Sequence, residues 1–109
     1  MTEIEELIDL LVKFRNERNW EQFHNSKDLA LALSIEAAEL TELFLWKGPD
    51  DVNVEKLKEE LADVFIYAFL LAKKHELDVN EIVVNKIKIN EKKYPAEKAK
   101  NSAKKYNEL

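Results

Sequence analysis

Two pairs of acidic residues stand three positions apart within segments that otherwise carry apolar side chains. Glu36 and Glu39 form the first pair, and Glu60 and Asp63 form the second. In a helix, this spacing puts both carboxylates of a pair on one face. Burying a carboxylate without a counter-charge is costly, and four that face each other require a cation. We therefore expect a divalent metal site, and the all-oxygen ligand set favours Mg²⁺, with Mn²⁺ as a possible substitute.

Spacing alone leaves other interpretations of the two pairs open. Both pairs would be ordinary surface charges if their helix faces were solvated. A di-iron bundle would need Glu-x-x-His motifs, whereas the only histidines, His24 and His75, fall outside both pairs. A non-catalytic helical oligomerisation or interaction module would explain the apolar segments and the charged exterior. It would leave the paired carboxylates without a purpose.

Helices must position these pairs, because one glycine and two prolines provide few turns. Apolar periodicity predicts four helices joined by short links, over about 3–18, 27–46, 54–75 and 79–93. Capping signals support these limits: Thr2 with Glu5, Ser26, and Asp78 with Glu81. We expect an all-α fold, a four-helix antiparallel bundle, with residues 1–109 as a single domain that ends in a Lys-rich tail over 96–109.

The predicted third helix is apolar around its whole circumference over residues 64–72. A helix of this kind needs cover on every side, and a chain of 109 residues provides little. We therefore expect a homo-oligomer in which a partner subunit covers one face of this helix.

Composition narrows the functional classes further. The chain has no cysteine, which excludes disulfides, thiolate zinc sites and cysteine nucleophiles, and suits a cytoplasmic protein. The net charge of −5 argues against a duplex nucleic-acid binder. The longest nearly apolar run, 61–72, is too short to cross a membrane. The first residues are acidic where a signal peptide would be basic.

The acidic pairs also carry a family resemblance. Glu36-Ala-Ala-Glu39 and Glu60-Leu-Ala-Asp63 resemble the E-x-x-E…E-x-x-D signature of the MazG-like all-α nucleotide pyrophosphohydrolases. Further motifs, spread over nearly the whole chain, look like the dCTP pyrophosphatase branch: Arg18-Asn-Trp-Glu-Gln-Phe-His24, Leu43-Phe-Leu-Trp46-Lys47, Asp63-Val-Phe-Ile-Tyr67, Lys86-x-x-x-Asn90, Lys93-Tyr94-Pro95 and Lys104-Lys-Tyr106-Asn-Glu-Leu109. The resemblance implies Mg²⁺-dependent cleavage of a nucleoside triphosphate, dCTP-like in this branch, to the monophosphate and pyrophosphate. It also implies a homotetramer built as a dimer of dimers.

The expected chemistry assigns roles to the acidic residues. Hydrolysis between the α- and β-phosphates needs an attacking water, charge neutralisation and a stabilised leaving group. We expect Glu36, Glu39, Glu60 and Asp63 to be metal ligands, with Glu39 the first choice as the catalytic residue that orients or deprotonates the water.

The resemblance also assigns substrate-binding residues. Lys86, Asn90 and Lys93 share a helix face that would ordinarily be solvated, and the family pattern makes them a triphosphate clamp. The aromatic residues would ordinarily belong to the core, and the branch instead implies a base pocket formed by Trp20, His24, Trp46 and Tyr67. The chain departs from the branch at Leu11, at the expected rim of this pocket, where a histidine can occur.

Overall fold

The computed structural model describes all residues 1–109 and contains helices and no strands. The all-α class is therefore confirmed. The chain divides into two compact units, unit 1 over residues 1–77 and unit 2 over residues 78–109. Unit 1 holds α1 (Glu3–Glu17), a 3₁₀ turn (Glu21–Phe23), α2 (Ser26–Glu42) and α3 (Val54–Lys74), and unit 2 holds α4 (Val79–Lys93), α5 (Ala96–Ala99) and a second 3₁₀ turn (Tyr106–Glu108). The single-domain organisation and the four-helix bundle stay predictions.

Side-chain caps start the helices much as the sequence predicts. Thr2 and Glu5 form a reciprocal capping box at α1, and Asp78 accepts a hydrogen bond from the Glu81 N–H at α4. Asn53 begins α3 by accepting hydrogen bonds from two backbone N–H groups. These bonds satisfy donors that the first turn of a helix cannot pair internally.

The expected cap of α2 is wrong by one residue. Asn25, not Ser26, caps this helix, because its Oδ1 accepts from the Asp28 N–H at 2.8 Å. Ser26 is the first helical residue, and its hydroxyl shares a 2.9 Å hydrogen bond with Nε2 of His75 at the end of α3. This bond ties the start of α2 to the end of α3.

The predicted end of α2 is also wrong. The helix ends at Glu42 rather than near Trp46. Residues 43–46 form turns through i to i−3 backbone hydrogen bonds, such as the 3.0 Å bond from the Phe44 N–H to the Thr41 carbonyl. Trp46 then takes a left-handed φ of 63°, so it does not extend the α2 face that carries Glu39.

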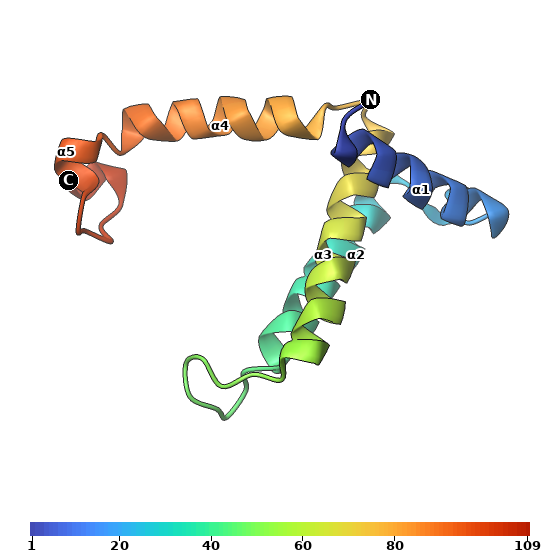
Figure 1. Cartoon of the computed structure of the whole chain (residues 1–109), viewed down its shortest axis with the longest axis horizontal. Helices are drawn as coiled ribbons and strands as arrows, with labels where there is room; N and C mark the ends of the chain where they lie inside the picture. Colours follow the sequence, from blue (N-terminus) through green and yellow to red (C-terminus); the bar gives the residue numbers. More distant parts are fainter. The chain divides into compact units, whose positions relative to one another are not determined.

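In unit 1, α3 is the central helix (Figure 1). It packs along α2 and also contacts α1. The buried core is small and consists of Ile8, Leu29, Leu70 and Ala72. Pairing α2 with α3 brings both acidic motifs to one interface. None of the helices has the length and apolar character needed to span a bilayer.

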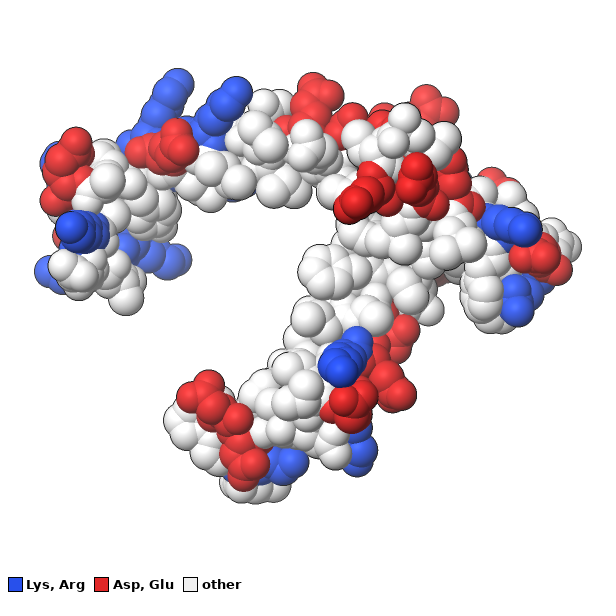
Figure 2. All heavy atoms as spheres, in the orientation of Figure 1, with Lys and Arg blue, Asp and Glu red and all other residues white.

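An apolar groove between α1 and α3 has no cover within unit 1. Phe65 is 51% exposed and stacks on Phe69 with ring centroids 5.8 Å apart. The groove has a volume of about 470 Å³ and is lined by Leu7, Leu11, Ala62, Phe65, Ile66 and Phe69. Figure 2 shows a stretch without charged side chains over the middle of unit 1. The apolar side chains on this face of α3 are therefore exposed at the surface of unit 1.

Unit 2 folds its tail back onto the end of α4. The rings of Tyr94 and Tyr106 meet edge to face, with centroids 6.2 Å apart, and the Lys93 ammonium lies 5.1 Å from the Tyr106 ring centroid. Eight lysines against five acidic residues give unit 2 a charge of +3, whereas nine basic against seventeen acidic residues give unit 1 a charge of −8. The lysines gather over the C-terminal half of α4 and the following segment (Figure 2).

The Asn53 cap provides a test of how α3 is started. We expect Asn53→Ala to lower the free energy of unfolding by about 1 kcal/mol, because two N–H groups lose their acceptor. The matched control Asn85→Ala removes an exposed amide inside α4 and should be neutral or slightly stabilising, since alanine favours helix. Urea denaturation of both variants measures the difference, and equal effects would contradict the capping role.

Candidate functional site

The interface of α2 and α3 gathers three of the four predicted metal ligands. Glu36 projects from α2, and Glu60 and Asp63 project from α3, and one carboxylate oxygen from each lies within 4.8 Å of the others. All three side chains are half-buried. The only ion pairs in the chain join Arg15 to Glu21 and Lys58 to Glu55, so no lysine or arginine neutralises the cluster.

Crowding makes the negative charge of this cluster costly. Burial raises the pKa of Glu36 to about 7, and hydrogen bonding with Glu39 and the charges of Glu39, Asp63 and Glu60 add to the shift. Burial also raises the pKa of Glu60, again with contributions from Glu39 and Asp63. Glu39 itself is exposed and borders the cluster. The four carboxylates predicted from the sequence therefore influence one another.

The donor set fits a divalent cation. Oε2 of Glu36 and Oε2 of Glu60 are buried and have no hydrogen-bond partner. Such orphaned oxygens need a proton or a cation, and hard divalent ions prefer carboxylate oxygen ligands. Glu36, Glu60 and Asp63 could hold the ion, with Glu39 beside them. The acidic cluster is thus consistent with divalent-metal binding.

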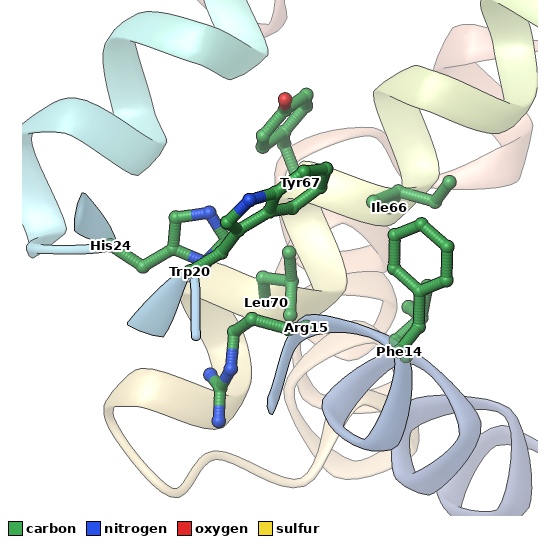
Figure 3. A pocket seen from close by; sticks show the side chains of 8 residues that line it. Phe14, Arg15, Trp20, His24, Ile66, Tyr67 and Leu70 are labelled. Carbon is green, nitrogen blue, oxygen red and sulfur yellow. The ribbon is translucent and has the colours of Figure 1, made fainter. Parts of the chain in front are cut away.

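An aromatic cavity lies between the end of α1, the following loop and α3. Its volume is about 80 Å³, and it is lined by Leu11, Phe14, Arg15, Trp20, His24, Ile66, Tyr67 and Leu70. Figure 3 shows Trp20, His24 and Tyr67 gathered on one side and Phe14 and Ile66 on the other. The aromatic walls offer ring faces and edges to a planar ligand, and the cavity would have to widen to enclose one, because its volume is below that of typical ligand pockets.

His24 is the polar group of this cavity. Its Nδ1 is buried without a hydrogen-bond partner. Burial lowers the pKa of His24, the Arg15 charge lowers it further, and Glu21 opposes the shift. The ring is therefore neutral near pH 7, and Nδ1 can donate or accept a hydrogen bond according to the tautomer.

Tyr67 connects the cavity to the acidic cluster. It lines the cavity one helical turn after Asp63. Burial raises the pKa of its phenol, and the nearby charges of Glu36, Asp63 and Glu39 raise it further. One side chain therefore faces both an apolar cavity and a cluster suited to a metal ion. A ligand with a flat ring and an anionic group could occupy both.

The remaining predicted site residues lie elsewhere. Trp46 does not line the cavity: it is 94% exposed in the connection between α2 and α3. That connection precedes Val54, and Tyr67 lies thirteen positions further along the helix, a rise of about 20 Å. Lys86, Asn90 and Lys93 lie in unit 2, on one face of α4.

Sequence reasoning missed four cavity residues, namely Phe14, Arg15, Ile66 and Leu70. Their signal was periodicity: Leu11, Phe14 and Arg15 share one face of α1, as Ile66, Tyr67 and Leu70 share one face of α3. The approach of α1 to α3, which makes these faces meet, is not visible in the sequence. Leu11 lies at the cavity, as expected.

Comparisons with known proteins identify the family and several similar chains. The model of the MazG-like family matches residues 31–109. The chain is 42% identical to dCTP pyrophosphatase 1 of Homo sapiens and 38% identical to that of Mus musculus, in both cases over 97% of this chain and 67% of the relative. The crystal structure of a pyrophosphatase from Archaeoglobus fulgidus superposes with a TM-score of 0.79 at 40% identity, covering 87% of this chain and 94% of that one.

The raised pKa of Glu36 predicts a pH-dependent stability in EDTA. Below pH 4.5 this residue is protonated in both the folded and unfolded chain, and between 4.5 and 7 the folded chain binds more protons. Stability should therefore fall as pH rises through this window. One pKa unit corresponds to about 1.4 kcal/mol, and solvent screening of a half-buried group should leave roughly 1 kcal/mol in all.

Glu36→Gln should remove that part of the pH dependence, so its unfolding free energy should change less between pH 5 and pH 8 than that of the wild type. Glu42→Gln, an exposed carboxylate on the same helix, should keep the wild-type difference. Urea denaturation at both pH values measures this, and an unchanged slope in Glu36→Gln would contradict the crowding of the cluster.

Proposed function

The chain belongs to the MazG-like family, and from this premise we propose that it is a nucleoside triphosphate pyrophosphohydrolase that converts dCTP or a close relative to the monophosphate and pyrophosphate. The junction at Tyr67 is the observation that carries this proposal. It places a cavity of aromatic walls directly beside the acidic cluster. A nucleotide would extend from base to phosphates across this junction.

We propose Mg²⁺ as the metal, with Mn²⁺ as a substitute. When bound, it would neutralise the phosphoryl oxygens and lower the pKa of an attacking water. Glu36, Glu60 and Asp63 hold the ion, which relieves the burial of their unpaired oxygens. Glu39 borders the cluster with its carboxylate exposed, so it can accept a proton from the water or orient it.

The base would lie in the cavity. Trp20 and Tyr67 offer aromatic faces and edges for stacking, and the unpartnered Nδ1 of His24 offers one hydrogen bond to the base. A buried polar atom without a partner discriminates strongly against ligands that leave it unpaired. The aromatic rings of the cavity would thus stack on any base, and the one polar contact would select among bases.

We assign the triphosphate to Lys86, Asn90 and Lys93, and the pattern of α4 supports this. At 100° per residue, the polar stripe lies between Val83 and Ile87 on one side and Ile82 and Ile89 on the other. The opposite face is mostly charged and carries Glu81, Lys88, Glu91 and Lys92, with Val84 as its one apolar residue. The stripe therefore belongs to the apolar face, which folded proteins cover. Neither lysine of the stripe has a carboxylate partner.

We further propose that the chain forms a homo-oligomer, a dimer of dimers, in the cytoplasm. A second copy would cover the apolar groove of unit 1, where Phe65 and Leu7 are about half exposed. The oligomer would also give a role to Trp46, which lies in the connection before Val54 and does not line the cavity of its own chain. Its exposed indole would complete the base pocket of a neighbouring subunit.

Product analysis tests the activity directly. With Mg²⁺, a panel of nucleoside triphosphates should yield monophosphate and pyrophosphate together, with dCTP among the best substrates. In oxygen-18 water, attack at the α-phosphorus should place the label in the monophosphate. A nucleoside diphosphate and inorganic phosphate as first products would refute the proposal.

Asp63→Asn should lower kcat by roughly a hundredfold or more, the scale typical of a lost charge-stabilising group. Glu59→Gln is the matched control, because it removes one negative charge from an exposed position beside Glu60 and leaves the cluster intact. Its activity should stay near that of the wild type. Circular dichroism checks that both variants are folded, and full activity of Asp63→Asn would remove the residue from the site.

A charged side chain placed in the apolar groove should disrupt the oligomer. Phe65→Glu should dissociate the oligomer and reduce activity, because it puts a carboxylate into the covered surface. Phe23→Glu changes an aromatic of comparable exposure outside the groove and should leave the assembly intact. Light scattering gives the molecular mass, and a monomeric wild type at micromolar concentration would contradict the expected interface.

A further inference from the structure

The C-terminal end of α1 carries a guanidinium stacked on the cavity wall. Arg18 is the C-cap residue of α1. Its guanidinium carbon lies 3.7 Å from the centroid of the Phe14 ring, and Nη1 donates a 3.0 Å hydrogen bond to the Phe14 carbonyl. No carboxylate lies within ion-pairing distance of Arg18, so its charge contacts an aromatic face and a carbonyl oxygen instead.

The same guanidinium reaches the second aromatic residue of the wall. It lies 6.0 Å from the Trp20 ring centroid. Phe14 and Trp20 meet edge to face, with centroids 5.7 Å apart and planes at 76°. Both line the cavity, yet they are 47% and 44% exposed, so the core does not lock either ring. The Arg18 side chain supplies part of the restraint that burial does not.

The backbone places these three residues together. Asn19 takes a left-handed φ of 54°, which reverses the chain directly after Arg18. The Trp20 N–H then donates to the Arg15 carbonyl at 3.1 Å, and Gln22 Nε2 donates to the Asn19 carbonyl at 2.9 Å. The loop is therefore fixed at its backbone, whereas the Phe14 and Trp20 rings depend on contacts with each other and with Arg18.

We propose that Arg18 is a positioning residue for base recognition, which holds Phe14 and Trp20 in the orientation that receives the base, and that Phe14 is a further wall of the base pocket. This proposal rests on the function proposed above. Arg18 acts through the two rings. A lysine could not replace it fully, because only the planar guanidinium can lie flat on a ring while donating in its own plane.

A positioning role predicts a specific kinetic change. If Phe14 and Trp20 are held less firmly, the free-energy cost of ordering them around the base rises, and the pocket discriminates less between bases of different shape. The metal cluster on α2 and α3 is not changed. Arg18→Ala should therefore raise KM for dCTP by about three- to tenfold, the range expected for one lost cation–π contact. The kcat should change less than about twofold, and the preference for dCTP over dATP should fall in the same variant.

Two further variants make the comparison specific. Arg18→Lys keeps the charge and should lie between Arg18→Ala and the wild type, and it serves in place of Arg18→Ala if the latter does not fold. Lys13→Ala removes a cation from an exposed position of α1 without any aromatic contact, and it should match the wild type in KM and selectivity.

A fluorescence measurement tests the wall without relying on activity. In a Trp46→Phe background, used for this purpose alone, Trp20 is the only tryptophan. Arg18→Ala should increase acrylamide quenching of Trp20, and Lys13→Ala should not. A wild type that does not hydrolyse dCTP would sink the proposed function, and the quenching result would still decide whether Arg18 holds Trp20.

The three measurements distinguish a positioning role of Arg18 from a purely structural one. Raised KM, lost base preference and increased quenching together support the positioning role. Wild-type values of all three in Arg18→Ala overturn it. A lower melting temperature with unchanged KM and base preference also overturns it, because that result shows a purely structural contact.

Discussion

Repulsion among the carboxylates at the α2–α3 interface is the constraint on which the site depends. Glu36, Glu60 and Asp63 approach within 4.8 Å without a basic partner, and two of their oxygens are orphaned. A fold optimised for stability alone would place apolar side chains there, since buried charges without partners destabilise proteins. The cost is tolerable if a cation or protons occupy the cluster. The packing of α2 on α3 is therefore coupled to ligand binding.

The helix α3 serves three purposes with two of its faces. One face carries Glu60 and Asp63 toward α2 and, one turn further on, Tyr67 into the cavity, whereas another face exposes Phe65 beside α1. The face with Tyr67 packs within unit 1, whereas the face with Phe65 is apolar although nothing in unit 1 covers it. A displacement of α3 by one partner would move the cluster and the cavity together.

Much of this arrangement could be predicted from residue spacing. The start of α3 follows from Asn53, and the facing of Glu60 and Asp63 follows from helical periodicity. The end of α2 could not be predicted, because the turns at 43–46 outcompete a helical continuation that the sequence permits up to Gly48. Ser26 is not the cap of α2 because Asn25 accepts the Asp28 N–H, and the Ser26 hydroxyl pairs instead with His75, a partner 49 residues away. The cavity, too, required the tertiary approach of α1 to α3.

The two units carry opposite net charges. Unit 1 carries −8 and the acidic cluster, so it repels a triphosphate until cations neutralise its carboxylates. Unit 2 carries +3, with unpaired lysines on the apolar face of α4. Each charge suits a different part of a metal-bound nucleotide, because carboxylates attract the cation and lysines attract phosphates.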